Sequence, residues 1–223
     1  MLNVGSSTAQ VYVGITLASE VYLGTVKVWP DKAPELFTFP YVSGLATQHN
    51  WNIPAGAKHV DVILCGGGGG GSNGTLALGN GKGGSAGLWK GIRLTPGVDT
   101  APGSLIQFSV GNPGEGGGAL NTPGRGGSTG ATYKTNSGDT LPTVIGDGGK
   151  PLDAPGVEGV SSGNFTYNGY TYPGGAGGGN PGTGPGKPGT APGGGGGGGG
   201  SQFATQLGAA GGGGIAYARV FYS

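Results

Sequence analysis

Charged residues are scarce in this sequence, and those present nearly cancel. Asp, Glu, Lys and Arg make up 9% of the 223 residues, and the formal net charge is +1. A nucleic-acid-binding protein would carry a basic patch or stripe, so no nucleic-acid partner is expected. The acids show no calcium-loop spacing, and two His with one Cys do not make a zinc site. We therefore expect no metal, no cofactor and no catalytic residues.

Cysteine and long apolar runs are also missing. The single Cys65 excludes an internal disulfide framework. No run approaches the roughly 20 apolar residues that span a bilayer, so no membrane insertion is expected. The start, MLNVGSST, has neither a basic nor an apolar region, which indicates a chain made without export. His59 and Cys65 would lie roughly 20 Å apart along one strand, too far for a base and its nucleophile.

Glycine, by contrast, is present in great excess. There are 59 Gly and 16 Pro, a composition that usually indicates disorder. However, the chain also has 9 Tyr, 6 Phe and 3 Trp, whereas disordered chains are poor in aromatic residues. Each Gly in regular structure costs about 0.5–1 kcal/mol of extra backbone entropy relative to Ala. A folded chain must therefore offset a large entropic penalty.

Two uninterrupted tracts, Gly66–Gly71 and Gly193–Gly200, indicate how this happens. Chains without Cβ atoms approach each other closely, and as extended polyglycine-II-like helices these tracts would span roughly 19 and 25 Å. Their backbone groups must be paired when buried, so we expect several tracts to pack as a bundle. Flexible linkers are the alternative. A collagen-like structure is excluded because the three-residue Gly period is not sustained.

The segments between the tracts predict strands and no helix. Asn168-Gly169 lies between two alternating aromatic runs and favours a two-residue type I′ hairpin. The apolar run 59–65 is typical of a strand buried on both faces. We predict an all-β fold, in which a small β-sandwich has the Gly tracts beside it as a second layer. Its expected strands are residues 36–42, 59–65, 88–94, 105–110, 165–167, 170–172 and 215–222.

The beginning of the chain contains a ten-residue repeat. VYVGITLASE is followed by VYLGTVKVWP over residues 11–30, which predicts a β-hairpin turning at residues 18–20. Pro30 and Pro34 then interrupt the pattern. We therefore divide the chain into an N-terminal hairpin segment, residues 1–33, and a glycine-rich β domain, residues 34–223.

The aromatic residues Tyr167, Tyr170 and Tyr172 have two interpretations. As exposed rings they would stack on the sugars of a cell envelope. As a cross-strand cluster they would instead support the hairpin, and this interpretation is favoured because small hairpins need such contacts.

The order of several motifs resembles the glycine-rich domain of phage tail proteins. The N-terminal VYLGTVKVWP is similar to the start of minor tail proteins from long-tailed phages of actinobacteria. The motifs that carry the domain resemblance are WNIPAGAKHVDVILCGGGGGG (51–71), GLWKGIRL (87–94), SVGNPGEGGG (109–118), NGYTYPGGAGGG (168–179), APGGGGGGGG (191–200) and GGGGIAYARVFY (211–222).

This resemblance implies a structural protein of the virion, at the tail tip or in a tail fibre, assembled in the host cytoplasm. It brings no catalytic residues. We expect residues 1–33 to dock onto other tail proteins, with Tyr12, Tyr22 and Trp29 as assembly contacts, while the glycine-rich domain projects. A homo-oligomer is expected, with a trimer as the leading hypothesis, because burying Gly-rich surface between subunits would offset the entropic cost.

Two alternatives remain open. In the first, the chain is a dedicated adhesin that recognises cell-envelope glycans on the host through Gly-rich loop tips and the aromatic residues Tyr167, Tyr170 and Tyr172. In the second it degrades the envelope, because two distant carboxylates can meet in a fold as they do in glycosidases. We expect no enzymatic activity, since ionisable groups are so few.

Overall fold

A computed structural model describes residues 32–43, 47–139 and 144–222 in full, together with the backbone of five short strands within residues 2–29. All regular elements of this described part are β-strands. No described segment forms a helix of the length and apolar character that crossing a bilayer requires. The all-β prediction is therefore confirmed.

The first main sheet has the antiparallel order β6-β15-β8-β9. Its strands are β6 (Glu35–Pro40), β15 (Ile215–Phe221), β8 (His59–Cys65) and β9 (Trp89–Leu94). The second sheet has the antiparallel order β12-β11-β10-β7. Its strands are β12 (Val144–Gly146), β11 (Thr129–Tyr133), β10 (Leu105–Ser109) and β7 (Gln48–Asn52).

The two sheets pack face to face around one apolar core. Alternate residues of β8 point in opposite directions, so Val62 and Leu64 join Phe108 of the second sheet in this core. Ile63 faces the other way and packs with Tyr172 and other aromatic residues outside the sandwich. The expected small β-sandwich, with 59–65 as a strand buried on both faces, is confirmed.

A short hairpin covers the outer face of the first sheet. Strands β13 (Phe165–Tyr167) and β14 (Tyr170–Tyr172) pair antiparallel. Asn168 and Gly169 have φ values of 47° and 81°, as a type I′ turn requires. The ring of Tyr167 lies where a side chain at Gly91 of β9 would be, so the sheet accommodates the hairpin through a missing Cβ.

The N-terminal repeat does not form the single hairpin that was expected. Instead β2 (Val11–Val13) pairs with β1 (Leu2–Val4) and β3 (Thr16–Leu17), whereas β4 (Val21–Leu23) pairs with β5 (Val26–Trp29). Each copy of the repeat therefore has its own antiparallel strand pair. The turn expected at residues 18–20 lies outside the described residues.

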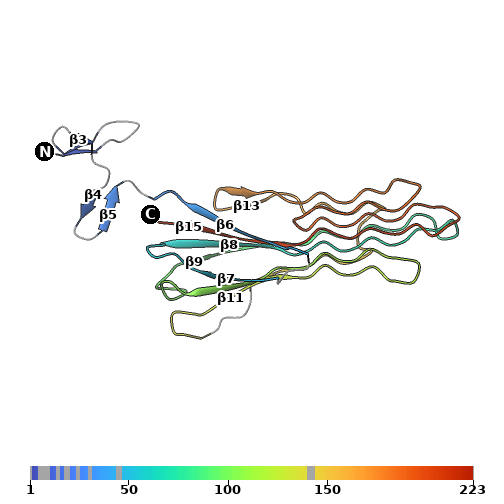
Figure 1. Cartoon of the computed structure of the whole chain (residues 1–223), viewed down its shortest axis with the longest axis horizontal. Coiled ribbons are helices and arrows are strands. Elements are labelled where there is room, and N and C mark those ends of the chain that lie inside the picture. The colour runs from blue at the N-terminus through green and yellow to red at the C-terminus, as the bar shows by residue number, and fades with distance from the viewer. Residues whose placement is uncertain are drawn as a thin grey trace.

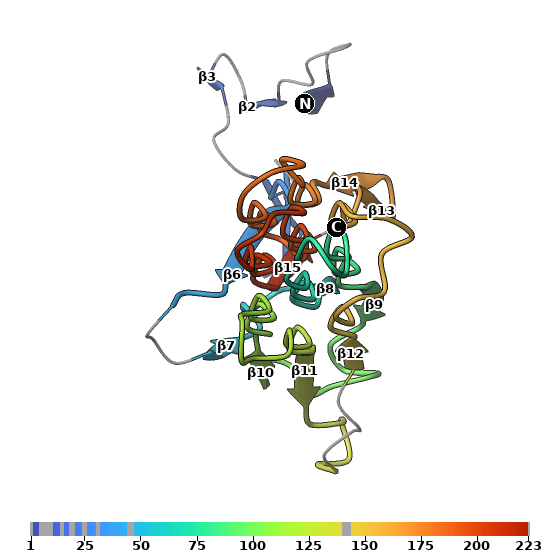
Figure 2. The ribbon, with the colours of Figure 1, turned by 90° about the vertical axis from the view of Figure 1, so that its right-hand side faces the viewer.

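The glycine tracts form a bundle that continues the sandwich lengthwise (Figure 1). They lie end to end with the strands, not beside the sandwich as a second layer, because several tracts run directly on from a strand: Gly66 follows β8, and Gly214 precedes β15. Viewed from the far end, the tracts are seen end-on as neighbouring narrow coils (Figure 2). The expected polyglycine-II packing is thus present, but the tracts extend the sandwich lengthwise and do not form a second layer beside it.

The tract Gly66–Gly71 lies at the centre of six others. Its amides donate hydrogen bonds to three neighbouring tracts, and its carbonyls accept from three more; for example, Gly67 donates to the Gly127 carbonyl at 2.9 Å and Gly68 accepts from the Gly114 amide at 2.8 Å. Its partners lie at residues 85–88, 114–117, 124–127, 149, 196 and 209–212.

A second central tract, Gly193–Gly200, is likewise surrounded by other tracts on all sides. The amide of Gly196 donates to the carbonyl of Gly69 at 2.9 Å, so the two centres are direct neighbours. Its hydrogen-bonded partners lie at residues 69–72, 81–87, 157–160, 178, 184–190 and 209–213. Both tracts are fully buried. Their backbone groups are paired within one chain, so the bundle itself does not require the subunit contacts from which a trimer was expected.

Position in the bundle explains where glycine is required. In the two central tracts every residue faces a neighbouring tract. A Cβ on any residue of Gly66–Gly71 would overlap backbone atoms of that neighbour. Tracts at the surface also contain positions that face solvent, and these positions accept side chains. In residues 111–117, for instance, Gly111, Gly114 and Gly117 are buried, while Asn112 and Glu115 are exposed.

Candidate functional site

Four loops close the end of the bundle that lies farthest from the sandwich (Figure 1). They connect outgoing tracts with returning ones and comprise residues 73–80, 118–123, 180–185 and 201–207. Backbone hydrogen bonds join three of the loops: the Leu76 amide donates to Gln202 at 2.7 Å, and the Ser201 amide donates to Gly182 at 3.2 Å. The fourth loop, residues 118–123, is closed by a bond of its own, from the Gly118 amide to Asn121 at 3.0 Å. All four loops are carried by the end of the bundle.

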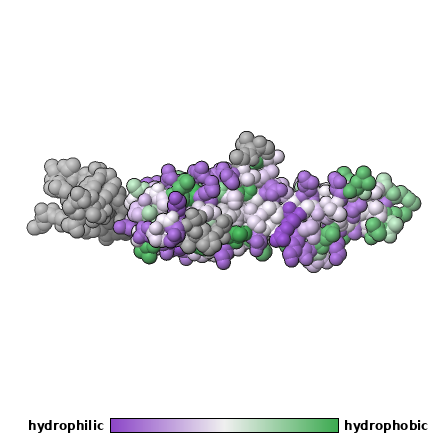
Figure 3. Space-filling model, turned by 90° about the horizontal axis from the view of Figure 1, so that it is seen from below, coloured by the Kyte–Doolittle hydropathy of each residue, from purple (hydrophilic) through white to green (hydrophobic). Residues whose placement is uncertain are grey.

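This surface exposes large apolar side chains. Leu120, Phe203 and Leu78 are 98%, 95% and 81% exposed, and Leu76 and Leu207 are also more than half exposed. In the space-filling view, hydrophobic residues, coloured green, cluster at this end of the molecule (Figure 3). We call the set Leu76, Leu78, Leu120, Phe203 and Leu207 the apolar tip.

The four loops contain no Asp, Glu, Lys or Arg. Single exposed apolar residues are ordinary, but several gathered on one uncharged surface are typical of an interaction site. Such a surface binds by excluding water and offers no charge for a charged partner. Sequence reasoning missed it. The available signal was the presence of Leu and Phe in Gly-rich turns, where polar residues usually dominate.

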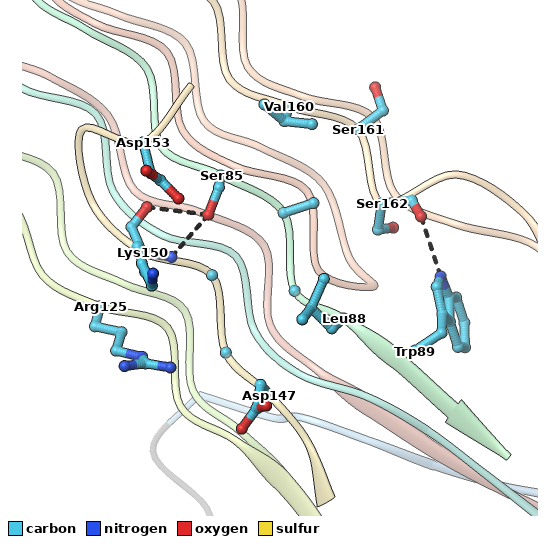
Figure 4. Close-up of a pocket in the computed structure, with 14 residues that line it drawn as sticks. Ser85, Leu88, Trp89, Arg125, Asp147, Lys150, Asp153, Val160, Ser161 and Ser162 are labelled. Carbon is cyan, nitrogen blue, oxygen red and sulfur yellow. Dashed lines mark hydrogen bonds between the residues drawn. The ribbon is translucent and has the colours of Figure 1, made fainter. Parts of the chain in front are cut away.

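A second candidate is a groove on the side of the bundle, next to the sandwich (Figure 4). It encloses about 590 Å³ between the tracts of residues 85–88, 147–150 and 160–162. The Ser85 hydroxyl accepts from the Lys150 amide at 2.8 Å, which links two of its walls. Trp89 lies at one end, where its indole N–H donates to the carbonyls of Ser162 and Gly163.

Four charged side chains line this groove. Arg125 and Lys150 supply positive charge, and Asp147 and Asp153 supply negative charge. Among the residues that the structure describes, none of the four is within ion-pair distance of an opposite charge. The groove therefore presents free donors and acceptors, a combination that suits a polar, polyhydroxylated ligand.

The tyrosines singled out from the sequence differ in accessibility. Tyr172 is 1% exposed, so it belongs to the packed interior and not to a contact surface. Tyr167 and Tyr170 are partly buried. Phe165 stacks between Trp89, at 5.5 Å, and Tyr167, at 6.2 Å. The arrangement is that of a cluster supporting the hairpin, the favoured interpretation.

Charged groups lock this hairpin to the sheet. Asp61 of β8 is completely buried and accepts two hydrogen bonds from Arg93 of β9, at 2.6 and 3.0 Å. Asn168, at the turn, donates to both oxygens of Asp61 at 3.1 Å. The Asp61 carboxylate raises the pKa of the Arg93 guanidinium by accepting its hydrogen bonds. Arg219 adds a contact, 3.9 Å above the ring of Tyr170.

The residues considered for chemistry are not assembled into a catalytic site. Cys65 is buried, and burial raises the pKa of its thiol to about 12, so the nucleophilic thiolate is disfavoured. His59, at the other end of β8, contacts Thr95 through Nδ1 at 3.2 Å. No cluster of three or more possible metal ligands occurs in the described ranges. The side chains of Tyr12, Tyr22 and Trp29, the expected assembly contacts, lie outside the described residues.

Comparison with known proteins relates this architecture to phages. The glycine-rich domain family matches residues 43–221, most of the chain. The Gene 32 protein of Mycobacterium phage L5 is 41% identical over 160 residues, which cover 70% of this chain and 71% of that protein. The Gene 32 protein of Mycobacterium phage D29 is 36% identical over 166 residues, with the same coverage. The chain is thus a phage glycine-rich protein and belongs to the glycine-rich domain family.

Proposed function

We propose that this protein is a structural component of the phage tail, at the tail tip or in a tail fibre, and that its glycine bundle carries the apolar tip toward the host surface. One observation carries the proposal: an uncharged, apolar surface lies at the end of the bundle opposite the end of the sandwich where the domain begins and ends. Lys32 lies 3.9 Å above the ring of Tyr222, so the first and last fully described residues are close together. Attachment at one end leaves the other free for contact.

The physical character of the bundle supports this role. Its paired backbone and absent side chains leave little freedom for bending, because each central residue has neighbours in every direction. The protein acts without catalysis, through shape and surface. Residues 1–33 attach it to other tail proteins during assembly in the host cytoplasm, and Tyr12, Tyr22 and Trp29 contribute to this attachment. A trimer remains the leading hypothesis for its oligomeric state.

Labelling of purified particles with a gold-conjugated antibody against the chain tests the location. We expect label at the distal part of the tail. Phages whose chain lacks residues 1–30 should produce the folded glycine-rich domain in infected cells without incorporating it. Absence of the protein from intact particles, or normal incorporation of the shortened chain, would contradict the proposal.

Adsorption kinetics test the tip. Phages with Leu78→Ser, Leu120→Ser and Phe203→Ser together should assemble in normal yield but adsorb to host cells several-fold more slowly. A control phage with Val98→Ser and Leu105→Ser alters exposed apolar residues outside both the tip and the side groove and should adsorb normally. Equal adsorption rates for the tip-variant phage and the control phage would contradict a role of the tip in host contact.

The side groove favours a second candidate function, that of an adhesin for cell-envelope glycans. Its Asp147 and Arg125 side chains, which have no ion-pair partner among the described residues, supply the donors and acceptors that sugar hydroxyls need. Saturable binding of purified host-envelope polysaccharide should then weaken at least tenfold in an Arg125→Ala, Asp147→Ala variant. The tip variant should bind the polysaccharide unchanged. No saturable binding by the wild-type chain would contradict this candidate.

A further inference from the structure

We propose that the apolar tip binds the acyl-chain region of a lipid surface, its side chains entering the lipid interface while the bundle stays outside. The inference rests on the proposed function, host contact by the tip, and names the class of partner. It differs from insertion of a spanning segment, since only loop ends enter the lipid.

The charge of the tip identifies an uncharged, apolar partner. The three most exposed side chains, Leu78, Leu120 and Phe203, project from three different loops, and none of the four tip loops carries an ionisable side chain. Entry of a charged side chain into lipid is unfavourable, whereas Leu and Phe gain from leaving water. A surface without charge also binds independently of ionic strength.

Part of the tip backbone is suited to an apolar medium as well. Unpaired amides are costly in lipid, where no water is present to satisfy them. At the tip the Leu76 amide donates to Gln202, and the Gly118 amide donates to Asn121 at 3.0 Å. The Leu78 amide donates to the Thr75 hydroxyl at 3.1 Å. These three amides are satisfied within the tip loops, so they can leave water without becoming unpaired donors.

A second copy of the chain is a less suitable partner. Five large side chains on each copy would bury about 1,000 Å² in total, taking about 100 Å² for each side chain. A stable, specific protein interface buries about 1,200–2,000 Å² in total, with complementary shape. A small projecting end meets this requirement poorly when placed against another projecting end. A fluid lipid surface adapts to it.

Buried Cys65, the single native cysteine, makes a direct test feasible. In the full chain, Phe203→Cys, Leu78→Cys and, as a matched control far from the tip, Val98→Cys are each labelled with an environment-sensitive fluorophore. Vesicles of phosphatidylcholine, which carry no net charge, are then added. We expect the emission at positions 203 and 78 to increase at least twofold and shift to shorter wavelength, whereas that at position 98 stays unchanged. The response should be equal at 50 mM and 500 mM salt.

Vesicle flotation with unlabelled full chain provides the second measurement. The Leu78→Ser, Leu120→Ser, Phe203→Ser variant should float at least tenfold less than wild type, and the Val98→Ser, Leu105→Ser control should float as wild type. No vesicle binding, or a fluorescence change shared by position 98, would overturn the lipid proposal. If vesicles do not bind but tip-dependent adsorption to cells persists, host contact stands and its partner is a protein or glycan. Tip-dependent dimerisation in sedimentation, without vesicle binding, would identify a second copy instead.

Discussion

Gly68 and Gly194 pack so closely that a Cβ on Gly68 would overlap the carbonyl oxygen of Gly194. The amide of Gly212 donates to this same carbonyl at 2.6 Å, while the Gly68 amide donates to Gly212 at 2.8 Å. Three tracts thus meet at one point, and each is held by backbone groups alone. This contact explains why the centre of the bundle consists of glycine only.

Substitution at this contact should be strongly destabilising. Gly68→Ala adds a methyl group against rigid backbone atoms, so we expect the free energy of unfolding to fall by about 3 kcal/mol, at the upper end of overpacking effects. Gly156→Ala is the matched control, because nothing lies within 4 Å of its Cβ position. That change should be neutral or raise stability by up to about 1 kcal/mol. Denaturant unfolding of both variants measures the difference, and equal stability would argue against close packing at Gly68.

The ion pair between the buried Asp61 and the partly exposed Arg93 should contribute substantially to stability. Arg93→Met leaves the Asp61 carboxylate buried with Asn168 as its remaining side-chain donor, and we expect a loss of about 3 kcal/mol. Arg125→Met removes an arginine without an ion-pair partner among the described residues and should change little. Thermal unfolding followed by circular dichroism provides the comparison. Similar melting temperatures for the two variants would contradict a structural role for the pair.

The Cys65 thiol should resist alkylation in the folded protein. Its pKa is raised to about 12 by burial, so at pH 8 both access and thiolate formation are disfavoured. We expect iodoacetamide to modify Cys65 at least a hundredfold more slowly than in guanidinium chloride, as measured by mass spectrometry. Comparable rates in the two conditions would show that β8 is not buried as described.

The same raised pKa predicts a loss of stability at alkaline pH. The unfolded chain loses the thiol proton near pH 9, whereas the folded chain holds it until about pH 12. The folded state therefore binds more protons than the unfolded state in this interval. The contribution of this group to the free energy of unfolding is fully present below pH 9. It falls as pH rises above 9, by about 1 kcal/mol per pH unit. Denaturant midpoints between pH 8 and 11 measure the slope. Cys65→Ala should make it shallower, and an unchanged slope would refute the assignment.

Strong local patterns made much of the fold predictable. The run ending at Cys65 and the Asn168-Gly169 turn each indicated the observed structure, because burial on both faces and a type I′ turn require particular residues locally. The strands β7, β11 and β12 were missed. Their sequences QHNWN, TGATY and VIG are polar, small or short, and they become strands through pairing with β10 and with each other.

The candidate site was much less predictable than the fold. Leu78, Leu120 and Phe203 come from distant parts of the chain, and they gather at one end because of the hydrogen-bond register of the bundle. No local pattern specifies this register, since glycine tracts lack distinguishing side chains. Tyr172, chosen for its aromatic ring, is buried because its strand lies on the sandwich.

Amide hydrogen exchange of the full chain tests the ordered glycine bundle most directly. Residues 193–200 donate to partners in several tracts, so their exchange should be slow, comparable with that of the buried strand β8. The exposed loop residues 203–205 serve as an internal reference for rapid exchange. Protection throughout residues 193–200 is the predicted result. Exchange there as rapid as in the loop would contradict the bundle and, with it, the rigid support of the apolar tip.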